Sequence, residues 1–298
     1  MKNKRKLEYI IQDEYSGKRV DEVLRAYWGI SGSLIKDLKH YEDGILLNGE
    51  HIRTVDTVSE GDKLSVAIYD TASEGIIPQK MELDILYEDE DILIINKPSG
   101  LPTHPSRGHF TDTLANGVIS HYIENGEEHV FRAVNRLDMD TSGVMCIAKN
   151  SYSHARLVEQ MKTGELSRKY AAIVEGAPEG GIIDAPIMRE SFLKRIVHPD
   201  GQRAVTHYRV ISRYEGYSLI ELSLETGRTH QIRVHMSYIG HPLLGDWLYG
   251  TEDHSLFDRQ ALHSKEIHLR QPVTGEELCF MSKIAPDMQS FLDGLKKI

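Results

Sequence analysis

Two aspartates and an arginine stand close together in the polar segment RLDMDTSG, which spans Arg136 to Gly143. The segment lies between a short apolar run and the apolar stretch VMCIAK. This pattern indicates a loop held between buried strands, a common place for catalytic residues. Asp138 and Asp140 share a face only if the backbone there is extended. The alternative is a simple turn, in which short polar side chains bond local backbone and Gly143 supplies a positive φ.

Arginines and histidines crowd a second segment, in which Arg228, His230, Arg233, His235 and His241 follow one another closely. If Thr229 caps a helix here, Arg228 stands at its amino-terminal end, where free backbone N–H groups favour an anion. His230 and His235 are five positions apart, which is a poor helical pairing for a metal ion. The spacing therefore disfavours a zinc site, and solvated side chains are the alternative to an anion site.

Two more segments carry candidate binding residues. Tyr170 lies in the strand-like stretch SRKYAAIVEG, as either a residue of the sheet face or an aromatic platform for a nucleobase. Residues 189–203, which include Lys194 and Arg195, hold four Lys and Arg against two acidic side chains. Such a local positive charge suits contact with phosphate, and a solvated hairpin is the alternative.

The first 75 residues predict a small module. Apolar residues at helical spacing indicate a helix over 18–28, and Ser31 or Ser33 can cap a second helix. Asn48-Gly49 is a strong hairpin turn between short strands, and a last strand covers 63–69. The predicted order is helix, helix, hairpin, strand. A polar stretch over 70–80 then reads as a linker.

After this linker the residue pattern changes, and the predicted strands outnumber the predicted helices. Strands are predicted on both sides of an acidic turn at 88–91, at 144–149, at 168–176 and at 218–224. Helices are predicted at 112–125, 151–163, 229–240 and from Pro286 onward. Because many strands are joined by connections too short for crossover helices, we expect an α+β domain over 76–298 with a mixed, mainly antiparallel sheet.

Length and charge limit the possible classes of protein. A chain of 298 residues predicts about two domains. The net charge of −10 disfavours a protein that coats a nucleic-acid backbone, but it permits a local basic site on an acidic body. We find no membrane-length apolar run and no signal peptide. Two cysteines form no disulfide framework and no metal spacing. The expected location is the cytoplasm, with no membrane partner.

Five segments together resemble the RluA family of pseudouridine synthases, in that family's order and with similar spacing. They are residues 96–106, 135–150, 168–176, 197–210 and 226–250. The first 75 residues resemble, more loosely, the S4-like RNA-binding module, a small αL-type domain often fused in front of these enzymes. One position departs from the family, because Asn135 stands where a histidine is usual. Asparagine keeps the hydrogen-bonding capacity without a titrating group.

The resemblance implies a reaction in which a uridine of RNA is detached at its glycosidic bond, rotated and rejoined through carbon 5. The nucleotide must be flipped into a pocket for this chemistry. Asp138 is implied as the catalytic carboxylate, Arg233 as the cation that keeps it ionised, and Tyr170 as the stacking platform. Contacts to substrate or RNA are implied for Arg136, Thr141, Arg228, His230, Gln231, Lys194 and Arg195.

The same resemblance implies no metal and no organic cofactor. It favours ribosomal RNA over transfer RNA as substrate, and a monomer is expected. The main alternative is an RNA-binding or ribosome assembly factor that has lost its chemistry on the same fold, which the departure at Asn135 would allow. A glycoside hydrolase is disfavoured, because Asp138 and Asp140 are two residues apart and such pairs rarely straddle a bond at the required separation.

Overall fold

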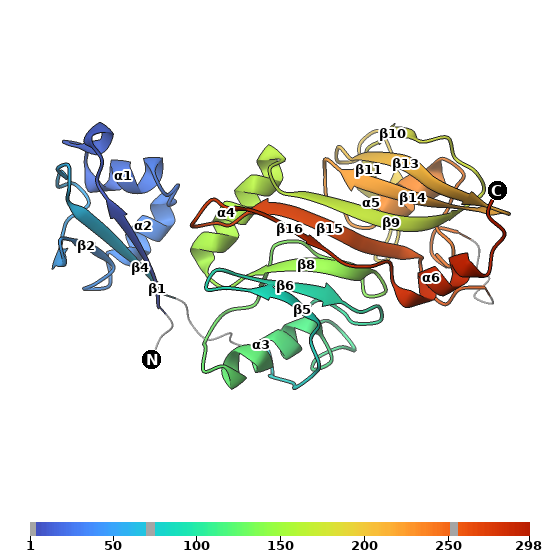
Figure 1. Ribbon diagram of the computed structural model, residues 1–298, viewed down its shortest axis with the longest axis horizontal. Coiled ribbons are helices and arrows are strands. Elements are labelled where there is room, and N and C mark those ends of the chain that lie inside the picture. The colour runs from blue at the N-terminus through green and yellow to red at the C-terminus, as the bar shows by residue number, and fades with distance from the viewer. Residues whose placement is uncertain (1–3, 70–74, 251–255) are drawn as a thin grey trace.

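The computed structural model describes residues 4–69, 75–250 and 256–298. They form an N-terminal module and a larger domain built on a long twisted sheet (Figure 1). Part of the predicted linker, residues 70–74, lies outside the described residues. No helix in the described ranges is long and apolar enough to cross a membrane.

The N-terminal module is a four-stranded sheet covered by two helices. Its elements are β1 (Lys4–Ile10), the short 3-10 helix η1 (Asp13–Tyr15), α1 (Val20–Ala26), α2 (Gly32–Leu38), β2 (Ile45–Leu47), β3 (Glu50–His51) and β4 (Lys63–Tyr69), and the strand order is β1-β4-β2-β3. Ser31 caps α2 by accepting the Leu34 N–H, one of the two caps expected. Asn48 and Gly49 take positive φ values of 53° and 88°, as the predicted tight turn requires.

The predicted order of this module omitted its first strand. The stretch KRKLEYI carries three basic residues and an acid, so its exposed side chains dominate the sequence pattern. Only Leu7 and Tyr9 turn inward, and both enter the core of the module. β1 pairs with β4 along its whole length and forms one edge of the module's sheet.

The larger domain is the α+β structure expected, with a ten-stranded sheet. Its elements are β5 (Ile85–Glu88), β6 (Ile92–Lys97), α3 (Leu114–Glu124), β7 (Arg132–Ala133), β8 (Ser142–Ala148), α4 (Ser151–Thr163), β9 (Ser167–Glu175), β10 (Gly181–Asp184), β11 (Ile187–Arg189), β12 (Arg195–Val197), β13 (Val205–Tyr214), β14 (Tyr217–Leu224), α5 (Gln231–Tyr238), β15 (Leu262–Arg270), β16 (Glu277–Met281) and α6 (Pro286–Asp293).

The strand order is β10-β13-β14-β9-β15-β8-β6-β5, with β16 beside β15 and β7 beside β8. Within the described residues, every strand pair of this sheet is antiparallel except β15 with β8, so the sheet is mixed and mainly antiparallel. Gly143 makes the parallel pair possible. Its φ is 113°, and a Cβ there would lie 2.2 Å from the carbonyl oxygen of Ser264 on β15.

The centre of the sheet is buried on both faces, as the continuous apolar runs predict. One face of β6 and β8 packs in the same core as α3, and the other face packs with Leu157 of α4. The loop 134–141, which carries Asp138, therefore leaves a rigid support. It runs from the end of β7 to the start of β8.

Candidate active site

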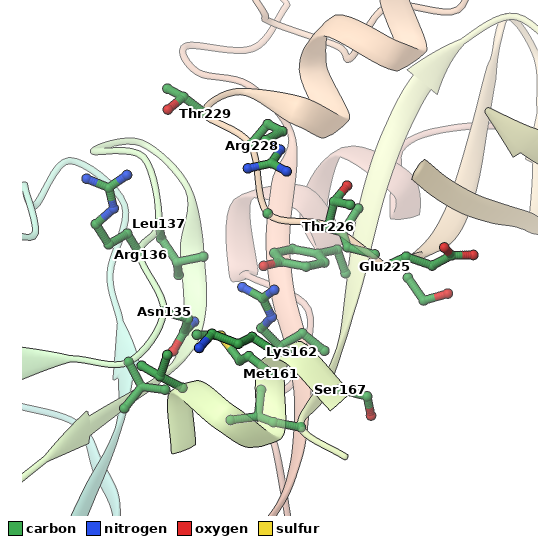
Figure 2. Close-up of a pocket in the computed structure, with 18 of the residues that line it drawn as sticks. Asn135, Arg136, Leu137, Met161, Lys162, Ser167, Glu225, Thr226, Arg228 and Thr229 are labelled. Carbon is green, nitrogen blue, oxygen red and sulfur yellow. The ribbon is translucent and has the colours of Figure 1, made fainter. Parts of the chain in front are cut away.

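A pocket of about 1300 Å³ opens between this loop and the segment that leads into α5. Figure 2 shows Arg136 and Leu137 on one wall, with Thr226 and Arg228 on the opposite wall. Met161 and Lys162, from the last turn of α4, lie along the lower edge in that view. Segments far apart in the sequence thus meet at this pocket.

Asp138 lines this pocket. Arg233, in the first turn of α5, hydrogen-bonds to Asp138 from the side away from the open space. Arg233 Nη1 donates to Asp138 Oδ2 at 3.2 Å. The side chain of Asp138 is 28% exposed and that of Arg233 only 6%, so the carboxylate faces the open space and the guanidinium is covered. Burial disfavours the charge of Arg233, yet its pKa is raised because hydrogen bonds and charge from Asp246 and Asp138 outweigh that burial. The predicted convergence of Asp138 and Arg233 is present.

Asp246 completes the arrangement, and sequence reasoning missed it. It is fully buried and accepts two hydrogen bonds from the other edge of Arg233, at 2.7 Å from Nε and 2.8 Å from Nη2. Gly245 before it has a φ of 72°, and a Cβ there would lie 2.1 Å from a backbone oxygen of Arg259. This bidentate pair fixes the guanidinium plane, so that the remaining nitrogen is directed at Asp138. The only sequence clue was that Asp246 lies within the segment 226–250, which resembles the family.

His230 lies beside the same carboxylate. Its Nε2 is 3.8 Å from Asp138 Oδ2, and its Nδ1 is 2.8 Å from the Tyr249 hydroxyl. That hydroxyl accepts the backbone N–H of Arg195 at 2.9 Å, which leaves its own proton to donate to Nδ1. Burial lowers the pKa of His230, so the imidazole next to Asp138 is neutral at neutral pH. Arg233 is therefore the cation that faces Asp138.

The prediction that Thr229 caps the helix is wrong. The cap position is His230, in the left-handed conformation with a φ of 57°, and α5 begins at Gln231. The physical reason is the Gln231 side chain. Its carbonyl oxygen accepts the Arg228 N–H and the Thr226 hydroxyl, while its amide donates to Val205 O and Thr206 Oγ1 on β13. The Gln231 side chain thus fixes the backbone that leads into α5, without a cap by Thr229.

The other residues singled out in the sequence differ in where they lie relative to the pocket. Asp138, Tyr170, Arg136, Arg228, His230 and Arg195 all line the pocket. Thr141 and Gln231 are buried beneath it, and the Thr141 N–H donates to the carbonyl of Asp138 at 3.1 Å. Lys194 lies on the hairpin β11–β12, which the basic segment 189–203 was expected to form. Asp140 is not part of the pocket lining, and Arg259 donates to its backbone carbonyl.

Two buried side chains secure the loop that carries Asp138. Asn135, the departure from the family pattern, accepts the Cys146 N–H of β8 at 2.9 Å. Lys97, which the sequence analysis did not single out, lies under the loop and donates to the carbonyls of Pro98, Leu101 and Met139, each at 2.8 Å. Burial lowers the pKa of Lys97 to about 7.

Among the residues described, no group of three side chains could hold a metal ion.

The comparisons with known proteins agree with this geometry. A family model for RNA pseudouridylate synthase matches residues 91–238. The uncharacterized RNA pseudouridine synthase YjbO of Bacillus subtilis is 44% identical over 271 residues, which are 89% of this chain and 95% of that protein. Ribosomal large subunit pseudouridine synthase D of Vibrio cholerae is 39% identical over 300 residues, covering 95% of this chain and 92% of its own.

A solved structure is similar as well. Human RNA Pseudouridylate Synthase Domain Containing 4 has a TM-score of 0.58 and 27% identity, over 70% of this chain and 91% of that one. These matches, with the α+β fold, place the chain among the pseudouridine synthases. More particularly, the chain belongs to the RluA family of RNA pseudouridine synthases. It is thus an isomerase that converts uridine in RNA to pseudouridine.

Proposed function

We propose that Asp138 is the catalytic carboxylate and that the substrate is a uridine of ribosomal RNA. The observation that carries the first part is the pairing at the pocket wall. Two carboxylates line the pocket, Asp138 and Glu225. Glu225 is bonded to Arg203 and His207 at the exposed rim, whereas Asp138 has a buried guanidinium directed at it and an open side toward the pocket.

The reaction assigns a task to each group. The flipped uracil stacks on Tyr170, which is a buried part of the pocket wall. The bond between uracil N1 and the sugar breaks, the base turns, and carbon 5 bonds to the sugar carbon while its proton leaves and N1 gains one. Asp138 either acts on the sugar or takes a proton, and both roles need an ionised carboxylate. Arg233 favours that ionised form and fixes its direction.

Ribosomal RNA as the substrate is supported by the relatives and by charge. The relative from Vibrio cholerae is named for the large ribosomal subunit, and it matches nearly the whole chain. This protein carries a net charge of −10, so RNA contact has to be local. Arg136, Arg228 and Arg195 around the pocket, with Lys194 on the neighbouring hairpin, provide that local positive charge.

We assign residues 1–75 to an S4-like RNA-binding domain and residues 76–298 to the catalytic domain. The N-terminal module has a separate hydrophobic core, made by residues of α1, α2 and its sheet, to which Tyr152 of α4 is added. Arg25 and Lys36 on its two helices are exposed and available for phosphate.

Release of tritium from carbon 5 of uridine tests the proposal. Labelled ribosomal RNA and transfer RNA are supplied separately to the wild type and to Asp138→Asn. We expect release from ribosomal RNA, loss of that release in the variant, and RNA binding within severalfold of the wild type. A variant with a near-normal rate would overturn the role of Asp138, and release from transfer RNA alone would overturn the substrate class.

A further inference from the structure

The two parts of the molecule are joined by an ion pair that neither part could make alone. Arg5 on β1 of the module reaches Asp91 at the start of β6, with Nε to Oδ1 at 3.0 Å and Nη2 to Oδ2 at 2.9 Å. The third nitrogen of Arg5 lies 2.7 Å from Glu90. A bidentate pair of this kind fixes direction as well as distance.

Asp91 is built to receive that arginine. Its side chain is fully buried, and it also accepts hydrogen bonds from Asn150, Ser153 and Gln271 at 2.9–3.1 Å. Burial alone would raise its pKa, but the hydrogen bond and charge of Arg5, followed by Gln271 and Asn150, lower it. The cation that pairs with the Asp91 carboxylate is Arg5, which comes from the module.

An apolar contact lies beside the ion pair. Tyr152, in the first turn of α4, is 3% exposed and belongs to the core of the module together with Tyr9 and Trp28. Arg156, one turn further along α4, lies against Gly29, where a Cβ would be 2.8 Å from its Nη1. The module therefore rests on the first two turns of α4, in agreement with the view in Figure 1.

The same helix reaches the active site. α4 has 13 residues, which makes it about 20 Å long. Its first turns hold the module, and its last turn, with Met161 and Lys162, lines the pocket (Figure 2). A single rigid element thus spans the distance between the module and the pocket that contains Asp138.

We propose that the Arg5–Asp91 ion pair, called the clasp below, holds the module as an arm in a fixed position relative to the pocket. The enzyme then selects uridines that lie at a set distance from the RNA bound by the module. Arg5 and Asp91 are then positioning residues for substrate choice. The inference rests on the proposed RNA binding by residues 1–75. A fixed arm raises the effective concentration of a matching RNA at the pocket, whereas a loosely tethered arm loses that advantage.

The test compares intact ribosomal RNA with the same RNA broken into short fragments, both labelled at carbon 5 of uridine. Arg5→Gln removes the clasp. We expect its kcat/KM on intact RNA to fall about 10-fold, while its rate on fragments stays within about twofold of the wild type. The matched control is Arg53→Gln, which breaks an exposed ion pair with Asp56 inside the module. We expect the control to behave as the wild type on both RNAs.

A second variant keeps the test independent of any effect on β1. Asp91→Asn breaks the same ion pair from the catalytic side, and it should show the same selective loss. Variants that keep the wild-type preference for intact RNA, or that lose activity equally on intact and fragmented RNA, overturn the clasp proposal. A wild type with no preference for intact RNA would instead refute RNA binding by the module, and its activity on fragments would still report the synthase.

Discussion

Two carboxylates of this protein are each paired with an arginine, and they differ in what surrounds them. Asp91 is completely buried and accepts hydrogen bonds from four residues, Arg5 among them. Asp138 keeps 28% of its side chain exposed and receives one arginine hydrogen bond, at 3.2 Å. In the Asp138 pair, Arg233 is the partner whose hydrogen bonds are filled, because Asp246 occupies its other edge.

This difference separates a structural carboxylate, Asp91, from Asp138, the carboxylate that we propose takes part in the reaction. Every strong donor around Asp91 is already used, so its charge contributes to holding elements together. Asp138 has acceptor positions that face an open pocket, so its charge remains available to a substrate. Removing Asp138 should therefore change mainly the turnover, and removing Asp91 should change mainly the free energy of unfolding.

The largest effect is expected from Asp138→Asn. Turnover should fall by about 10³-fold, because an amide can neither carry the charge nor accept a proton at this position. The free energy of unfolding should stay within about 0.5 kcal/mol of the wild type, since the side chain is partly exposed. Single-turnover tritium release and urea unfolding measure the two quantities, and a large loss of stability would contradict the division.

Asp246→Asn should affect both quantities. It leaves the buried Arg233 without its main counter-charge, so we expect a loss of about 4 kcal/mol in the free energy of unfolding. Turnover should fall by about 10²-fold, because the guanidinium is no longer held toward Asp138. Glu225→Gln, a pocket carboxylate at the exposed rim, is the control and should change stability little. An active, stable Asp246→Asn enzyme would refute the supporting role.

Asp91→Asn should lower stability while sparing the chemistry. We expect a loss of about 2 to 3 kcal/mol, smaller than for Asp246 because Arg5 can turn toward Glu90 and solvent when its partner is lost. The rate on short RNA fragments should remain close to that of the wild type. Urea unfolding and tritium release on fragments measure the result. A strong loss of turnover on fragments would show that Asp91 reaches the catalytic site.

The smallest effect is a pH dependence of stability that comes from a buried imidazole. Burial lowers the pKa of His263 from 6.5 to about 4. The unfolded chain therefore binds more protons than the folded protein between these values, and stability falls as the pH drops below 6.5. From pH 6.5 to 5 the loss from this group is about 1.6 kcal/mol. His263→Asn should flatten that part of the profile, and an unchanged slope would assign it to other groups.

Sequence reasoning found the residues whose partners are near in the chain or belong to a known motif. The turn at Asn48-Gly49 and the convergence of Asp138 with Arg233 are of this kind. It missed Asp246 and Lys97, because their importance comes from contacts that only the folded chain makes. Asp91 was hidden in the acidic turn at 88–91, since nothing local shows that one carboxylate there is buried under the module.

The position of β15 has a consequence for the folding of the enzyme during its synthesis. β15 lies between β8 and β9, and it is the strand that joins the half of the sheet that follows the Asp138 loop to the half that carries Tyr170. A nascent chain that has already produced Asp138, Tyr170 and Arg233 still lacks this joining strand. The fold of the catalytic domain can therefore be completed only late in translation, after residues 262–270 have been made and have paired with β8 and β9.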